Sequence, residues 1–285
     1  MNNTLRLESP AKVNLRLEIL RRREDGYHEL RTIFQKISLH DTLRFSLGKE
    51  RGISIAADHP KLPVGKNNLA YKAAQSMLKA SSYKGGIHIE IEKRIPLGAG
   101  LGGGSSNAAT TLKALNQLFE VRLPKKDLLA MGLEIGADVP FFLSEGAAIG
   151  SGIGEQLKKV ELPDLWYVLI YPNFEVSTRW AYGNFVLTNQ PFHLSLHRLL
   201  KTPEGISRIL LNHLEAVVSG KYPEIGLMKE TLVSAGALGA LMTGSGPTVF
   251  GLFDNESIST AAFRKIKRMA EEKGWAAFKA HSLTV

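Results

Sequence analysis

The sequence predicts an α+β fold with two lobes. Strand patterns dominate the first third of the 285 residues. Along the chain, strands and helices occur in groups and do not alternate strictly. This length and 44% apolar residues suffice for a full core. We place the boundary before a buried strand in the second half, which gives an N-terminal lobe of residues 1–155 and a C-terminal lobe of residues 156–285.

Alternating apolar and polar residues predict the strands of the first third. Residues 13–19 show the period of a half-buried strand that ends before the polar stretch 21–26. Residues 87–91 show the same alternation and lead directly toward a glycine-rich segment. Shorter strands are predicted near residues 42–47 and 52–57.

Helical spacing of apolar residues begins after the glycine-rich segment. The apolar residues from Ala108 to Phe119 predict a helix that starts near residues 105–106 and ends before Pro124. Further predictions are helices over 67–80 and 127–135, a buried strand over 166–171, a largely helical region over about 177–235, and a strand, glycine-rich turn and strand over 238–253.

The amino-acid composition excludes some kinds of functional site and favours others. The absence of cysteine excludes disulfides, thiolate metal ligands and cysteine nucleophiles. No secretory signal or membrane-spanning run is visible, so we expect a cytoplasmic protein with no membrane partner. A net charge of +9 suits a nucleotide or a nucleic acid, and the alternative is an ordinary solvated basic surface. The basic residues are scattered and are not interleaved with aromatic residues, so nucleic acid is only the second hypothesis.

The glycine-rich segment contains more glycine than an ordinary turn needs. Successive glycine N–H groups can point into one concavity, and the following helix adds its positive end, so we predict a polyphosphate site. The segment lacks the ending of a Walker loop and the spacing of a dinucleotide-binding motif. The residues of this predicted polyphosphate site are Pro96, Leu97, Gly98, Ala99, Gly100, Leu101, Gly102, Gly103, Gly104, Ser105 and Ser106.

The two serines have two interpretations. Their hydroxyl groups can bind phosphate oxygens or a magnesium ion. Alternatively, the segment is a flexible linker and the serines merely cap the helix. The strand before the loop and the helix after it favour the phosphate site.

Three motifs occur in order along nearly the whole chain. They are Ser-Pro-Ala-Lys-Val-Asn-Leu at residues 9–15, the glycine-rich loop, and Leu-Met-Thr-Gly-Ser-Gly-Pro-Thr at residues 241–248. On these motifs the sequence resembles the GHMP kinase family, which includes galactokinases, homoserine kinases and mevalonate kinases. The resemblance implies ATP and Mg²⁺, an N-terminal lobe with a left-handed β-α-β unit, a C-terminal ferredoxin-like α/β lobe, and an active site between the lobes.

Further segments refine the resemblance. They are the Gly-Leu-Gly-Gly-Gly-Ser-Ser form of the loop and residues 25–30, 67–69 and 136–142. With them the chain most resembles family members that phosphorylate the 2-hydroxyl of 4-diphosphocytidyl-2-C-methyl-D-erythritol in non-mevalonate isoprenoid synthesis. Ala99, where glycine is common, is a mild departure. The alternatives are a GHMP kinase for mevalonate, homoserine or a sugar, and a catalytically silent nucleotide-binding or RNA-binding protein.

The resemblance implies catalytic roles for two residues. Asp138 matches the family's catalytic base, although an aspartate this close to Pro140 can also be a helix N-cap. Lys12 matches the lysine that pairs with that aspartate and stabilises the developing charge, whereas an isolated strand lysine is usually solvated. Asn14 lies on the same strand face and would orient the substrate, or is an ordinary surface asparagine.

The resemblance also implies a cytosine site. Tyr27 and His28 match the residues that hold the base, with the histidine at its edge and aromatic rings on its faces. Tyr182 would supply the second ring, with Thr178 nearby, although helical packing is the alternative for Tyr182.

The remaining implied contacts involve the adenine and the phosphates. Asn67, Asn68 and Lys93 would line the adenine end, with helix capping as the alternative for either asparagine. Gly244 and Ser245 would approach the substrate diphosphate or close under the phosphate loop, unless their turn is a plain hairpin. The sequence does not assign magnesium ligands.

Overall fold

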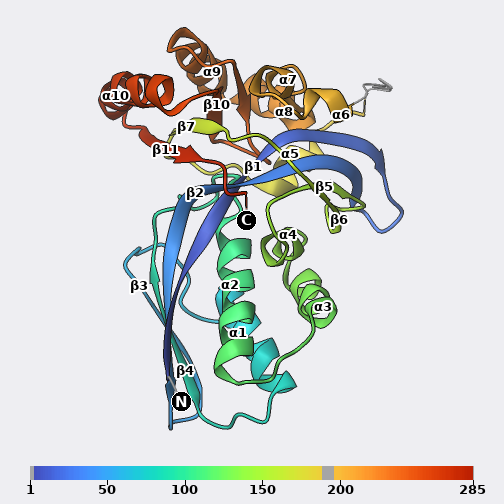
Figure 1. Ribbon diagram of the computed structural model, residues 1–285, viewed down its shortest axis with the longest axis vertical. Coiled ribbons are helices and arrows are strands. Elements are labelled where there is room, and N and C mark those ends of the chain that lie inside the picture. Colours follow the sequence, from blue (N-terminus) through green and yellow to red (C-terminus); the bar gives the residue numbers. More distant parts are fainter. Residues whose placement is uncertain (1–2, 188–195, 285) are drawn as a thin grey trace. The chain divides into compact units, whose positions relative to one another are not determined.

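The computed structural model describes residues 3–187 and 196–284, in which the chain forms two compact units (Figure 1). Unit 1 comprises Met1–Ala11, His40–Leu97 and Gly102–Glu145, and unit 2 comprises Lys12–Leu39, Gly98–Leu101 and Gly146–Val285. Strands β1 (Thr4–Arg22) and β2 (His28–Gly48) each contribute one end to each unit. The lobe boundary predicted at residue 155 stays a prediction.

The sheet of unit 1 contains the predicted β-α-β unit. Strand β4 (Gly86–Glu92) pairs antiparallel with the end of β2, where Leu43 faces Ile91, and parallel with β3 (Gly52–Ala57). Helix α1 (Leu69–Ala80) connects the two parallel strands. The left-handed sense of this connection stays a prediction.

The described residues of unit 1 form four helices. Helix α2 (Gly103–Leu118) packs against α1, α3 (Lys125–Ile135) and α4 (Val139–Leu143). The predicted helices over 67–80 and 127–135 are confirmed within two residues at each end. Helix α2 begins two residues before its predicted start, because the glycine at position 102 already takes the N-cap position.

The ferredoxin-like arrangement predicted for the C-terminal lobe is confirmed in unit 2. Its antiparallel sheet has the order β11-β7-β10-β9, and the strands are β7 (Trp166–Tyr171), β9 (Gly239–Met242), β10 (Val249–Phe253) and β11 (Ala276–His281). Helices α8 (His213–Lys221) and α9 (Glu224–Ser234) lie between the first and second strands in sequence, and α10 (Glu256–Glu272) between the third and fourth.

Shorter elements complete unit 2. Strand β5 (Ala147–Ser151) pairs with β2 and β6 (Gln156–Val160), and β8 (Leu211–Asn212) pairs parallel with β1. The other helices are α5 (Thr178–Gly183), α6 (Leu196–Leu199) and α7 (Pro203–Ser207). Part of the region predicted as largely helical, residues 188–195, lies outside the described residues.

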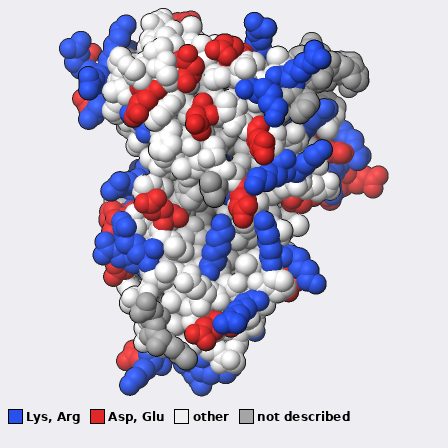
Figure 2. All heavy atoms as spheres, viewed as in Figure 1, with Lys and Arg blue, Asp and Glu red and all other residues white. Residues whose placement is uncertain are grey.

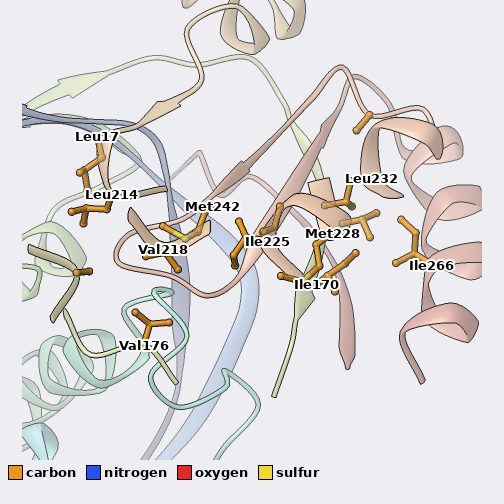
Figure 3. Packing of buried hydrophobic residues seen from close by; sticks show 14 of the residues in the cluster. Leu17, Ile170, Val176, Leu214, Val218, Ile225, Met228, Leu232, Met242 and Ile266 are labelled. Atoms are coloured by element: carbon orange, nitrogen blue, oxygen red, sulfur yellow. The ribbon is translucent and has the colours of Figure 1, made fainter. Parts of the chain in front are cut away.

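The main core of unit 2 lies between the antiparallel sheet and its helices. Figure 3 shows Ile170 of β7 facing side chains from the helices, among them Met228 of α9 and Ile266 of α10. Full burial of one such side chain contributes roughly 1.5–3 kcal/mol to the free energy of folding. This cluster therefore stabilises the sheet that carries the turn between β9 and β10.

Candidate active site

The glycine-rich loop connects β4 to α2, as the sequence predicts. Gly98, Gly100 and Gly102 have φ of +59°, +77° and +70°. Residues with a Cβ atom rarely adopt this backbone conformation. A Cβ on Gly100 would overlap the carbonyl oxygen of Thr243. The loop therefore needs glycine for its own conformation and for close packing in unit 2.

The start of α2 has several features that an anion-binding site needs. The first intrahelical bond runs from the N–H of Ser106 to the carbonyl of Gly102, which leaves the N–H groups of Gly103, Gly104 and Ser105 without intrahelical acceptors. No acidic residue occupies the first turn, and no side chain caps it. Gly104 is exposed, and a Cβ there would meet only Leu69, at 3.6 Å. These features suit a phosphate group.

The two serines of the loop differ in burial. Ser106 is buried, and its hydroxyl oxygen lies 2.8 Å from Ser9 Oγ, which also lies 2.8 Å from Asn107 Oδ1. This network ties the first sequence motif to α2 within unit 1. Ser105 is only half-buried, so it is the more accessible hydroxyl of the pair.

Asp138 occupies the N-cap position of α4 but makes no capping hydrogen bond with its side chain. The capping alternative for this residue is therefore not what the structure shows. Asp138 is half-buried, and a Cβ on nearby Gly136 would lie 3.9 Å from Ser105 Oγ. Because α4 also packs on α2, unit 1 holds Asp138 close to the start of α2.

Lys93 is held by a buried carboxylate. Its Nζ lies 2.8 Å from Asp41 Oδ2, and the two side chains are 2% and 0% exposed. Asp41 also accepts hydrogen bonds of 2.8 Å from the N–H groups of Arg94 and Ile95. Burial lowers the pKa of Lys93, and the charge of Asp41 opposes this shift. A Cβ on Gly103 would lie 3.2 Å from Lys93 Nζ, so the Lys93–Asp41 ion pair packs against the first residue of α2.

The two predicted adenine-site asparagines have different environments. Asn68 is buried, accepts a hydrogen bond from the N–H of Ala70 at 2.8 Å, and donates one to the carbonyl of Pro63 at 2.7 Å. It therefore caps α1, which was the alternative for this residue. Asn67 is exposed, and its proposed adenine contact stays a prediction, as does that of Lys93.

Strand β1 places Lys12 in a buried polar cluster of unit 2. Lys12 is 3% exposed, and its Nζ donates a hydrogen bond of 2.6 Å to Asn14 Oδ1 and lies 5.6 Å from the ring centroid of Phe34. The prediction of a half-buried strand is wrong here, because the polar face of residues 12–18 is buried as well. Distant segments contribute to this cluster, since Asn14 Nδ2 donates to Thr32 Oγ1 and Arg16 donates to the carbonyl oxygen of Ile209.

The turn between β9 and β10 joins this cluster. The N–H of Asn14 donates to Thr243 Oγ1 at 2.9 Å. A Cβ on Gly244 would lie 2.9 Å from the carbonyl oxygen of Gly100 and 3.3 Å from Lys12 Nζ. The turn is thus more than a plain hairpin, since within unit 2 it contacts residues of the other two motifs.

Two of the predicted cytosine-site residues, His28 and Tyr182, meet in unit 2. The rings of His28, at the start of β2, and Tyr182, in α5, have centroids 5.3 Å apart at an interplanar angle of 32°. Tyr27 is 61% exposed. Burial lowers the pKa of His28, and the charge of Arg22 lowers it further. The imidazole is therefore neutral at pH 7 and can both donate and accept hydrogen bonds.

Two further contacts connect the turn to its surroundings. Thr178 Oγ1 lies 2.8 Å from Ser245 Oγ, which links α5 to the turn. The sequence analysis missed Asn212, whose buried amide donates to the carbonyl groups of Met242 and Gly244. An asparagine ahead of a helix predicts a cap, but the sequence gives no signal for a partner 32 residues away.

Known proteins resemble this chain over nearly its whole length. The family described as GHMP kinases N terminal domain matches residues 68–146, and GHMP kinases C terminal matches residues 196–277. A 4-diphosphocytidyl-2-C-methyl-D-erythritol kinase of Geobacter sulfurreducens is 45% identical over 274 residues, which cover 96% of this chain and 97% of that protein. The chain belongs to this family of GHMP kinases.

Two other relatives agree with the family assignment. A 4-diphosphocytidyl-2-C-methyl-D-erythritol kinase of Syntrophus aciditrophicus is 48% identical over 255 residues, which cover 88% of this GHMP kinase and 91% of the relative. The crystal structure of a 4-(cytidine 5'-diphospho)-2C-methyl-D-erythritol kinase matches it with a TM-score of 0.84 and 35% identity, covering 99% of this chain and 100% of that one.

Proposed function

We propose that this GHMP kinase transfers the γ-phosphoryl group of ATP to the 2-hydroxyl of 4-diphosphocytidyl-2-C-methyl-D-erythritol, a step of non-mevalonate isoprenoid precursor synthesis. The observation that carries the proposal is the contact between the rings of His28 and Tyr182. Mevalonate, homoserine and sugars contain no base for such a pair to recognise. The relatives of 45% and 48% identity bear the corresponding enzyme name, which supports the same substrate.

The start of α2 binds the ATP phosphates in this proposal. Its unpaired N–H groups and positive helix end face the phosphates, and the accessible hydroxyl of Ser105 adds a further contact. Positive φ angles recur at every second residue of the loop, at Gly98, Gly100 and Gly102, before any ligand is bound. The loop backbone therefore loses little conformational freedom when ATP binds.

The residues present also fit Mg²⁺. This ion is usually held by one or two protein oxygen atoms together with substrate phosphates. The half-buried hydroxyl of Ser105 supplies such an oxygen atom at the start of α2. Residues 3–187 and 196–284 contain no group of three or more His, Asp or Glu side chains that could hold a metal, which agrees with a site completed by phosphates. When bound, the ion would neutralise phosphate charge.

Asp138 and Lys12 perform the proton and charge steps. The substrate oxygen forms a bond to the γ-phosphorus while the bond from that phosphorus to the β-γ bridging oxygen breaks, and ADP leaves. Asp138 accepts the hydroxyl proton, and the Lys12 ammonium stabilises negative charge on the transferring group. The pairing of Lys12 with Asp138 stays a prediction, as does an active site between the lobes.

The acceptor contacts complete the proposal. His28 hydrogen-bonds the edge of the cytosine, while Tyr182 and Tyr27 contact its faces. Gly244, Ser245 and Thr178 lie beside the substrate diphosphate, where the Ser245 and Thr178 hydroxyls can donate to phosphate oxygens.

The surface charge favours a small anionic ligand over a nucleic acid. Figure 2 shows basic and acidic side chains interspersed over the face in view, rather than a basic track. No described helix is long and apolar enough to cross a membrane. The cytoplasmic location stays a prediction.

ADP release by the purified protein tests the function. Mg-ATP is supplied with one acceptor at a time: 4-diphosphocytidyl-2-C-methyl-D-erythritol, mevalonate, homoserine or galactose. We expect turnover with the first acceptor only. Turnover confined to another acceptor overturns the substrate, and the absence of turnover with all four favours a binding protein without activity.

A further inference from the structure

We propose that Thr32 is a positioning residue for phosphoryl transfer, which fixes the Lys12 ammonium group through the side-chain amide of Asn14. The inference rests on the proposed function, because it assigns Thr32 to the same reaction. No sequence motif includes Thr32, which lies in β2, 20 residues after Lys12.

Two hydrogen bonds connect Lys12 to Thr32 through Asn14, and a third connects Thr32 to Arg16. Lys12 Nζ donates to Asn14 Oδ1 at 2.6 Å, and Asn14 Nδ2 donates to Thr32 Oγ1 at 2.8 Å. Thr32 Oγ1 donates to the carbonyl oxygen of Arg16 at 2.7 Å. All of these residues belong to unit 2, so the chain of bonds lies within one compact body.

The donors and acceptors in this series of hydrogen bonds are fixed, because each group has a limited number of hydrogens to donate. A threonine hydroxyl has one hydrogen, and Thr32 gives it to the carbonyl of Arg16. Toward Asn14 the hydroxyl can therefore only accept, so the NH₂ side of the amide must face Thr32. The amide oxygen then faces Lys12, where it accepts from the ammonium group.

Because the Asn14 amide is buried, its orientation depends on the Thr32 hydroxyl. Asn14 and Thr32 are each 1% exposed, so water does not replace a missing partner. Without the Thr32 hydroxyl, the NH₂ group of Asn14 loses its acceptor, and rotation of the amide would place NH₂ donors against the ammonium of Lys12. Thr243 Oγ1, 3.4 Å from Asn14 Oδ1, is too distant to fix the amide with a strong bond.

The position of Lys12 matters because of its crowded surroundings. Its Nζ lies 3.3 Å from the place of a Cβ on Gly244, in the turn that also contacts the glycine-rich loop. A shift of the ammonium group therefore changes its distance from the transferring phosphoryl group. Errors of about 1 Å in the placement of a catalytic group can lower rates by roughly 100-fold.

The test compares Thr32→Val, which keeps the shape and removes the hydroxyl, with Thr32→Ser, which keeps the hydroxyl. Both are made in the wild-type and Asn14→Ala backgrounds, and Thr231→Val in α9 serves as a matched control outside the cluster. We expect Thr32→Val to lower kcat by about 10- to 100-fold with KM for ATP little changed. Thr32→Ser and Thr231→Val should keep kcat near the wild-type value.

The Asn14→Ala background separates positioning from folding. If Thr32 acts through Asn14, Thr32→Val should cause little further loss of kcat once the amide is absent. An equal loss in both backgrounds, or wild-type kcat for Thr32→Val, would overturn the inference. If Thr32→Val does not fold, Thr32→Cys, with its weak hydrogen-bonding group, takes its place.

A crystal structure keeps this test independent of the proposed substrate. In Thr32→Val we expect the Lys12–Asn14 hydrogen bond to be broken or the amide to be rotated, whichever acceptor the enzyme uses. An unchanged Lys12–Asn14 bond would contradict the inference even if the wild-type enzyme is active. Failure of the wild-type protein to use the cytidylyl acceptor would overturn the proposed function alone.

Discussion

The side-chain amide of Asn212 donates a hydrogen bond of 2.8 Å to the carbonyl oxygen of Gly244. The same amide donates to the carbonyl of Met242 at 2.7 Å, and its oxygen accepts from the N–H of Leu214 at 3.0 Å as the N-cap of α8. One buried residue thus anchors the turn that contacts Gly100 and Lys12.

Asn212→Asp should separate the two tasks of this residue. Aspartate still caps α8 but cannot donate, and it places a carboxylate beside two carbonyl oxygens, so we expect a stability loss of about 1–3 kcal/mol. KM for the cytidylyl acceptor should also rise. Urea unfolding and steady-state kinetics measure the two effects. The control is Asn255→Asp at the N-cap of α10, where the asparagine accepts from the N–H of Ile258 and donates to Asp254 at an exposed position, so a smaller effect is expected. Equal stability of Asn212→Asp and wild type would contradict the anchoring role.

Gly104→Ala should weaken ATP binding while leaving the fold intact. Gly104 is exposed at the start of α2, its backbone does not need positive φ, and a Cβ there makes only an ordinary contact. Any loss must then come from steric exclusion of the phosphates, seen as a higher KM for ATP at unchanged Tm. Gly100→Ala is the contrast, because its Cβ would overlap Thr243 and Tm should fall. Wild-type KM for Gly104→Ala would count against phosphate binding at this position.

Asp138→Asn should lower kcat by orders of magnitude and leave ATP binding nearly unchanged. The amide cannot accept the hydroxyl proton, whereas its size preserves the start of α4. Calorimetric titration with ATP and ADP release measure binding and turnover separately. Asp164→Asn is a matched control at an exposed position. Substantial turnover by Asp138→Asn would remove Asp138 from the role of base.

His28→Ala should weaken binding of the cytidylyl acceptor far more than binding of ATP. In the wild type the lowered pKa keeps His28 neutral at pH 7. Protonation begins only below the usual range near pH 6.5, so KM for the acceptor should rise on the acid side and stay flat above it. Kinetics of both proteins between pH 5 and 8 measure this. Equal losses for ATP and acceptor would exclude His28 from base recognition.

His213 should make stability fall in acid. Its Nδ1 accepts from the N–H of Ile19 at 3.0 Å, and burial lowers its pKa, with Glu18 opposing the shift. The unfolded chain takes up the proton first, so this stabilisation is complete above about pH 6.5 and decreases as the pH falls toward the folded-state pKa. His213→Asn keeps an acceptor and does not titrate. Between pH 7.5 and 5.5 the wild type should lose more Tm than the variant, and parallel losses would refute this role.

Local patterns in the sequence predicted much of the fold. The strand over 166–171, the glycine loop between a strand and a helix, and the two strands around the turn after Met242 are all confirmed. Their signals are short-range, since alternation, helical spacing and glycine clusters are visible within about 15 residues. Helix α10 carried such signals too, with Asn255 as its cap and apolar residues at helical spacing, yet neither it nor β11 was predicted.

The first half of β2 had a different reason for being missed. Its buried polar residues, among them Thr32 and Gln35, do not show an apolar alternation. Gln35 is satisfied by the carbonyl of Leu283, 248 residues away, and Thr32 by partners on β1. A sequence pattern cannot show that a polar side chain will find such partners.

The sequence by itself determined the residue types of the site and the family to which they belong, because motif spacing survives without coordinates. Only the tertiary structure decided which of these residues share an environment. It made Asn68 a helix cap, buried Lys93 against Asp41, and placed the His28 ring beside Tyr182. The physical reason is that hydrogen bonds, burial and ring contacts between distant segments depend on chain packing, which no local pattern encodes.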